Sequence, residues 1–122
     1  MIEKGLKHTS ELTVTEALTA QRMGSGDLPV LATPAMLALM ENAAMKAVAN
    51  ELQDGQTTVG GQIASSHLKP SAVGDVVKAT AILEQVDGKK LSFRIQAFSG
   101  DTLLGEGTHL RFIVDRKKFM AK

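Results

Sequence analysis

The chain has 122 residues, of which 43% are hydrophobic and 22% charged, and its formal net charge is +1. This length predicts one domain, residues 1–122, with a single core, and the near-neutral charge gives no electrostatic case for binding nucleic acid or an anionic membrane. The absence of cysteine excludes disulfides and a cysteine nucleophile, and the charged first residues show no apolar stretch typical of a signal peptide. We therefore expect a cytoplasmic protein.

The first third of the chain is predicted to be a strand followed by a loop. A modest alternation of apolar and polar residues over 9–16 is typical of a strand. Residues 17–32 have no clear periodicity, and the glycines and proline of residues 23–29 indicate a loop. This loop leads directly into the start of a long helix.

The helix is predicted from about residue 34 to 52, and its apolar residues recur at spacings of three and four. They form one stripe: Met36, Met40, Ala43, Ala44, Ala47, Val48 and Leu52. Thr33 stands before Pro34 and is predicted to cap the helix, because proline fits the first turn, where no amide hydrogen is needed. Gly55 is a plausible terminator. One acid, Glu41, lies in the middle of the apolar pattern.

After the helix the pattern changes to period two, which predicts four more strands. They cover residues 57–68, 76–86, 90–98 and 103–114. The second and third are predicted to bury Val77, Ala79, Ala81, Leu83, Leu91, Phe93, Ile95 and Ala97. Asp87 and Gly88 between them indicate a hairpin.

The outer two of these four strands are less regular. Val59, Ile63 and His67 are predicted on one face of the first. In the last, Leu110, Phe112 and Val114 alternate with His109 and Arg111. The basic residues 116–122 are predicted to fray.

The predicted order is a strand, a long helix and four strands, so one antiparallel sheet must curl around one helix in an α+β arrangement. Such a sheet has two edges, and pairing of edges across a two-fold axis would hide them. We expect a homodimer, with a tetramer as a further possibility.

Five short stretches add to the element order: Val30–Met36, Leu39–Ala43, Thr58–Gly61, Ser66–Pro70 and Gly105–Arg111. In this order and at these spacings they resemble the fluoroacetyl-CoA thioesterase-like family of hotdog-fold enzymes, from about Leu6 to Val114. The resemblance implies a hotdog fold, with a long central helix wrapped by a curled antiparallel sheet. It also implies an acyl-CoA thioesterase.

The resemblance assigns catalytic roles to Thr33, Glu41 and His67, and places Gly60 at the thioester carbonyl. The residue types fit: a glutamate can be a general base or a nucleophile, and a histidine can pass a proton to the leaving thiolate. One geometric problem follows, since eight residues of helix separate Thr33 from Glu41 by about 12 Å. The loop must fold back, or the helix must start later, or the site must combine groups from two subunits.

Two glycines and one arginine are candidates for substrate binding. Gly60 and Gly61 inside a strand indicate a bulge or a close backbone approach, where an amide could meet the carbonyl oxygen. Arg111 is the favoured partner of the coenzyme A phosphates, because it shares a strand face with small glycines. His109, on the same face, is interpreted as a surface or packing residue.

We therefore expect hydrolysis of a short- or medium-chain acyl-CoA, with no cofactor and no metal. Family members specialised for the fluorinated acyl group carry phenylalanines in the segment before the threonine, whereas Gly24–Leu31 has no aromatic residue. Fluoroacetyl specificity is thus not expected. The first alternative is a non-catalytic acyl-CoA-binding hotdog protein, and an enoyl-CoA hydratase-type hotdog ranks behind it. A purely structural protein is the last alternative.

Overall fold

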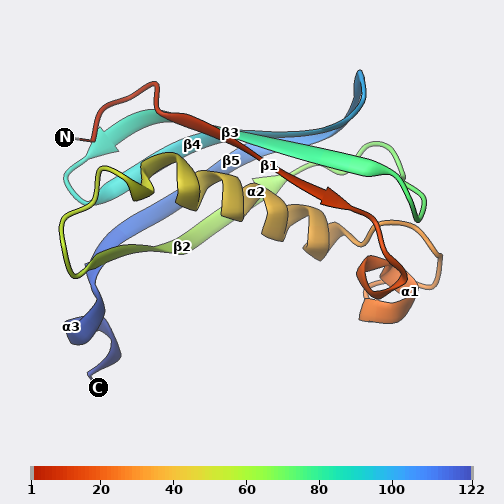
Figure 1. The fold of residues 1–122 in the computed structure, drawn as a ribbon, viewed down its shortest axis with the longest axis horizontal. Helices are drawn as coiled ribbons and strands as arrows, with labels where there is room; N and C mark the ends of the chain where they lie inside the picture. The colour runs from red at the N-terminus through yellow and green to blue at the C-terminus, as the bar shows by residue number, and fades with distance from the viewer. Residues whose placement is uncertain (1, 122) are drawn as a thin grey trace.

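The computed structural model describes residues 2–121, and its centre is the helix α2, Thr33–Ala49 (Figure 1). Pro34 lies in the first turn, as expected, but the residue that caps the helix is Ala32, so the predicted capping role of Thr33 is wrong. The apolar stripe is buried: Ala35, Met36, Leu39, Met40, Ala43, Ala44 and Val48. The helix ends at Ala49, earlier than predicted, and the chain turns at Gly55 with a φ of +84°.

One five-stranded antiparallel sheet wraps around this helix (Figure 1). Its strands are β1 Lys7–Thr13, β2 Gln56–Ser65, β3 Val76–Asp87, β4 Lys90–Ser99 and β5 Thr102–Asp115. They lie in the order β1-β3-β4-β5-β2, so that β1 and β2 form the two edges. The predicted strand, helix and four strands of the hotdog fold are confirmed.

The core lies between α2 and the concave face of the sheet. All eight residues predicted to point inward from β3 and β4 are buried: Val77, Ala79, Ala81, Leu83, Leu91, Phe93, Ile95 and Ala97. Strict alternation works in these two strands because they pair in the middle of the sheet, with a turn at Gly88 where φ is +62°.

The edge strand β2 departs from alternation because it contains a bulge around Gly61. Residues that pair directly opposite each other share a face of the sheet. Val59 pairs with Phe112, whereas Ile63 pairs with His109, so the two lie on opposite faces. The prediction that Val59 and Ile63 share a face is wrong, since the extra residue of a bulge reverses the pattern.

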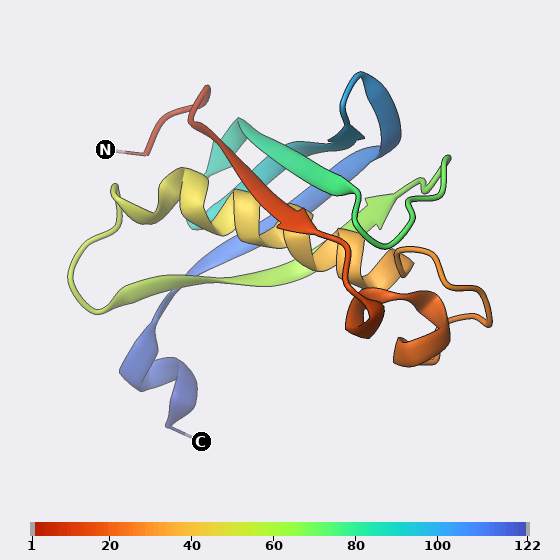
Figure 2. The ribbon, with the colours of Figure 1, turned by 45° about the vertical axis from the view of Figure 1, so that its right-hand side comes forward.

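Short helices occupy two segments that the sequence did not mark as helical. The 3₁₀ helix η1, Glu16–Leu18, and the helix α1, Ala20–Met23, lie in the predicted loop before α2 (Figure 2). The predicted frayed tail contains the helix α3, Arg116–Met120, in which Asp115 Oδ1 accepts a hydrogen bond from the Lys118 amide at 3.0 Å. None of the helices within residues 2–121 is long and apolar enough to cross a bilayer.

Candidate active site

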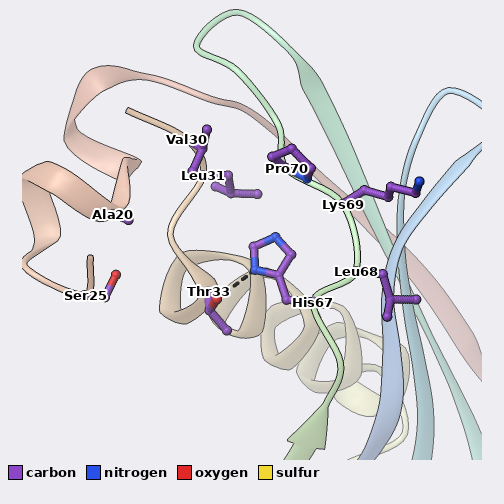
Figure 3. Close-up of a pocket in the computed structure, with 9 residues that line it drawn as sticks. All are labelled: Ala20, Ser25, Val30, Leu31, Thr33, His67, Leu68, Lys69 and Pro70. Atoms are coloured by element: carbon purple, nitrogen blue, oxygen red, sulfur yellow. Dashed lines mark hydrogen bonds between the residues drawn. The ribbon is translucent and has the colours of Figure 1, made fainter. Parts of the chain in front are cut away.

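Thr33 and His67 meet at the N-terminal end of α2. Thr33 is the first residue of the helix, and His67 follows the end of β2, which returns along the helix. The Thr33 Oγ1 atom lies 2.7 Å from Nδ1 of His67, a hydrogen bond between side chains 34 residues apart (Figure 3). Because Thr33 does not cap the helix through its side chain, its hydroxyl is free to serve this contact.

The environment of His67 favours the neutral imidazole. Burial lowers the pKa of His67 below its ordinary value, and a backbone interaction with Lys69 offsets part of this effect. Nε2 is buried and has no hydrogen-bond partner among the described residues. A neutral imidazole with an unprotonated Nδ1 accepts the hydrogen of the Thr33 hydroxyl, which is the arrangement of a general base.

A cavity of about 250 Å³ opens beside this pair. Its lining comes from α1, the loop before α2 and the segment after β2: Ala20, Ser25, Val30, Leu31, Thr33, His67, Leu68, Lys69 and Pro70. Figure 3 shows the imidazole between the start of the helix and the side chains of Leu31 and Pro70. Most of the lining side chains are small or aliphatic, so the cavity suits a compact apolar group next to a proton acceptor.

Glu41 lies elsewhere, two turns along the same face of α2. The helix is unbroken from Thr33, so about 12 Å of helix separates Thr33 from Glu41, and a later helix start is excluded. The Glu41 side chain is 41% exposed, and its Oε2 atom lies 4.0 Å from Nη1 of Arg111. Within one chain the structure therefore brings together Thr33 and His67, but not Glu41.

The two glycines of β2 face opposite directions. A Cβ atom on Gly60 would lie 2.7 Å from Glu41 Oε2, so Gly60 leaves the space that the carboxylate uses. A Cβ atom on Gly61 would overlap the ring of Phe112, so Gly61 makes room for packing on the other face. Gly60 thus lies beside the candidate site, whereas Gly61 packs against Phe112, and an amide contact of Gly61 with substrate stays a prediction.

Arg111 and His109 form a buried polar group behind Glu41, which the sequence did not predict. Arg111 is only 6% exposed, and it donates from Nε to Thr58 Oγ1 and from Nη2 to the Thr58 carbonyl, both at 2.9 Å. Of the two interpretations of His109, as a surface or a packing residue, burial supports the second. The guanidinium is bonded inside the protein, and its contact with coenzyme A phosphates stays a prediction.

Alternation along β5 contained the signal for this group. His109 and Arg111 share a face with Gly105 and Gly107, opposite the apolar Leu110 and Phe112. The apolar face normally turns inward, but here the polar face meets the helix. A histidine and an arginine beside two glycines were therefore the visible sign of a close, polar contact.

Comparison with known proteins identifies the family. The model of the fluoroacetyl-CoA-specific thioesterase family, FlK, matches residues 14–117. A fluoroacetyl-CoA thioesterase of Streptantibioticus cattleyicolor is 39% identical over 93 residues, which are 76% of this chain and 67% of that protein. The chain belongs to the fluoroacetyl-CoA-specific thioesterase family. Its predicted class, a hydrolase of acyl-CoA thioesters, is thereby confirmed.

Solved structures agree with this assignment. The structure of the fluoroacetyl-CoA thioesterase FlK has a TM-score of 0.92 at 31% identity, covering 99% of this chain and 94% of that one. A mutant of FlK in complex with fluoroacetate and CoA has a TM-score of 0.88 at 31% identity, covering 97% and 99%. A thioesterase superfamily member from Thermus thermophilus has a TM-score of 0.91 at 28% identity, covering 99% and 90%.

Proposed function

We propose that this thioesterase hydrolyses short acyl-CoA thioesters with Thr33, His67 and Glu41 as its catalytic residues. The observation that supports this most directly is the hydrogen bond of 2.7 Å between Thr33 and His67 at the mouth of an apolar cavity. In the general-base route, Glu41 accepts a proton from the water that attacks the acyl carbon, and neutral His67 passes this proton on to the departing thiolate. In the nucleophilic route, Glu41 attacks the acyl carbon and the thiolate leaves. His67 then accepts a proton from the water that hydrolyses the anhydride and returns it to the thiolate, so that the acid and the Glu41 carboxylate are both released.

We propose that the complete site forms between two copies of the chain. Thr33 and Glu41 lie on one unbroken helix, too far apart to act on one bond. The edge strand β2 carries Gly60, beside Glu41, and leads to His67 seven residues later. Antiparallel pairing of two β2 edges around a two-fold axis between residues 63 and 64 would set Gly60 opposite His67 of the partner subunit. The homodimer predicted from the sequence would then also complete the active site.

The cavity beside Thr33 supports a short aliphatic acyl group as the substrate. The cavity, about 250 Å³ in volume, is small and open to solvent on one side. The residues of the preceding segment that line it are Ala20, Ser25, Val30 and Leu31, and none is aromatic. We expect no preference for fluoroacetyl-CoA over acetyl-CoA, and a cytoplasmic location remains a prediction.

Thiol release from a series of acyl-CoA substrates tests this function. We expect turnover of short- or medium-chain acyl groups, and a loss of about 100-fold or more in kcat for Glu41→Ala and for His67→Ala. The matched controls are Glu11→Ala and His8→Ala on the edge strand β1, away from the cavity, which should retain full activity. Coenzyme A binding without thiol release would favour the non-catalytic alternative, and full activity in both site variants would contradict the proposed residues.

A further inference from the structure

Behind Glu41 lies a buried cation that the chemistry above does not use. The guanidinium of Arg111 forms two hydrogen bonds of 2.9 Å with Thr58, and its Nη1 atom lies 3.2 Å from His109 Nε2. His109 Nδ1 in turn lies 2.8 Å from the carbonyl oxygen of Gln62. The guanidinium is thus held by β2 and β5 together.

The partners of His109 determine its protonation. A carbonyl oxygen only accepts and a guanidinium only donates, so Nδ1 carries the hydrogen toward Gln62 and Nε2 accepts from Arg111. Burial lowers the pKa of His109, and the charge of Arg111 adds to this effect despite the opposing charge of Glu41. His109 is therefore neutral, and it supplies no charge to balance the arginine.

The charge that faces Arg111 is the carboxylate of Glu41, at 4.0 Å from Nη1. A buried cation is costly unless a counter-charge lies near it, so the two groups attract each other across the helix and the sheet. The missing side chain at Gly60 lets the carboxylate lie against β2, since a Cβ atom there would be 2.7 Å from Oε2 and 3.5 Å from Nη1 of Arg111. Arg111 and Gly60 together define where Glu41 points.

We propose that Arg111, fixed by Thr58 and His109, is a positioning residue that holds the Glu41 carboxylate against Gly60 for the reaction. This inference rests on the proposed catalytic role of Glu41. Arg111 acts through Glu41, because each of its three nitrogens already bonds Thr58 or His109 inside the protein. Its loss should leave substrate binding intact and misplace a reacting group.

A double-mutant cycle tests this role. Arg111→Gln should lower kcat by about 10- to 100-fold with little change in KM, since misplacement by about 1 Å can cost two orders of magnitude. Arg111→Lys keeps the positive charge but loses the forked set of guanidinium N–H donors. Its rate should therefore lie between those of Arg111→Gln and the wild type. In the Glu41→Gln background, the same Arg111→Gln change should alter the residual rate by less than about twofold.

Two further variants complete the test. Gly60→Ala displaces the same Glu41 carboxylate from the other side, so it should lower kcat even though Arg111 is intact. This variant keeps the proposal testable if the Arg111→Gln protein does not fold. Arg94→Gln is the matched control, because Arg94 lies on the neighbouring strand β4 in an exposed ion pair with Glu84 at 3.6 Å. It should retain full kcat and KM.

The possible failures are distinguishable. An active Glu41→Gln enzyme contradicts the proposed function itself. An inactive Glu41→Gln enzyme beside fully active Arg111→Gln and Gly60→Ala enzymes overturns the positioning role alone. An equal loss from Arg111→Gln in both backgrounds would also overturn it, as would a raised KM at unchanged kcat, which would place Arg111 at the coenzyme A moiety.

Discussion

The pairing of Thr33 with His67 shows how a single hydroxyl changes its role with its surroundings. Thr33 precedes a proline at a helix start, a position where a threonine side chain usually caps the helix. The backbone of Ala32 takes the capping position instead, and the Thr33 hydroxyl turns to Nδ1 of His67. The family resemblance indicated both residues, but only the fold could show that they bond, since 34 residues separate them.

The protonation of His67 predicts the pH dependence of hydrolysis. Catalysis needs the neutral imidazole, and burial lowers the pKa of His67 from 6.5. Activity should therefore fall as the pH drops through that lowered value. The acid limb of kcat/KM, which reports the free enzyme, should lie below pH 6.5.

The pKa of His67 can also be measured directly. An NMR titration of the imidazole resonances should give the same midpoint, and His67→Gln identifies the resonance by removing it. An NMR midpoint at or above pH 6.5, the ordinary value for histidine, would show that burial does not control this group.

At the scale of elements, the sequence predicted the centre of the sheet well and its β2 edge poorly. In β3 and β4 every second residue is apolar, and both strands have neighbours on each side, so alternation translated directly into burial. In β2 the bulge at Gly61 reversed the faces, and in β5 the inward face is polar. The departure in β5 places Arg111 beside Glu41, and neither departure follows from local propensity.

The glycines of β5 provide a test of how closely these strands approach. A Cβ atom on Gly107 would overlap the carbonyl oxygen of Ala64 and lie 2.7 Å from Cα of Ser65, both backbone atoms of β2. Gly107→Ala should therefore destabilise the fold by about 3 kcal/mol or more, because backbone cannot move as a side chain can. Urea unfolding followed by circular dichroism measures this change.

Gly60→Ala is the matched control for stability. It makes the same substitution in the neighbouring strand, but the closest atom is the end of the flexible Glu41 side chain. We expect a loss below about 1 kcal/mol for this variant. A wild-type unfolding midpoint for Gly107→Ala would contradict the close approach of β2 and β5.

For the whole molecule, the sequence predicted the layers of the fold. It also raised the question of how Thr33 and Glu41 can act on the same bond. Of the three ways considered to bring Thr33 and Glu41 together, the unbroken helix α2 excludes a later helix start. Thr33 belongs to this helix, so folding of the preceding loop cannot move it. We propose that two copies of the chain assemble the site, and this proposal can be tested without a structure of the dimer.

Complementation between two inactive variants is the decisive measurement for a shared site. If Glu41 of one chain acts with Thr33 and His67 of the partner subunit, a mixed dimer of Glu41→Ala and His67→Ala chains has one intact site and one doubly altered site. After unfolding and refolding together, half of the dimers are mixed by random pairing, so we expect about one quarter of wild-type activity. Each variant refolded alone, and a mixture of the two after separate refolding, are the controls. A site confined to one chain would give no recovery in the co-refolded sample, because every chain would then lack one of its catalytic residues.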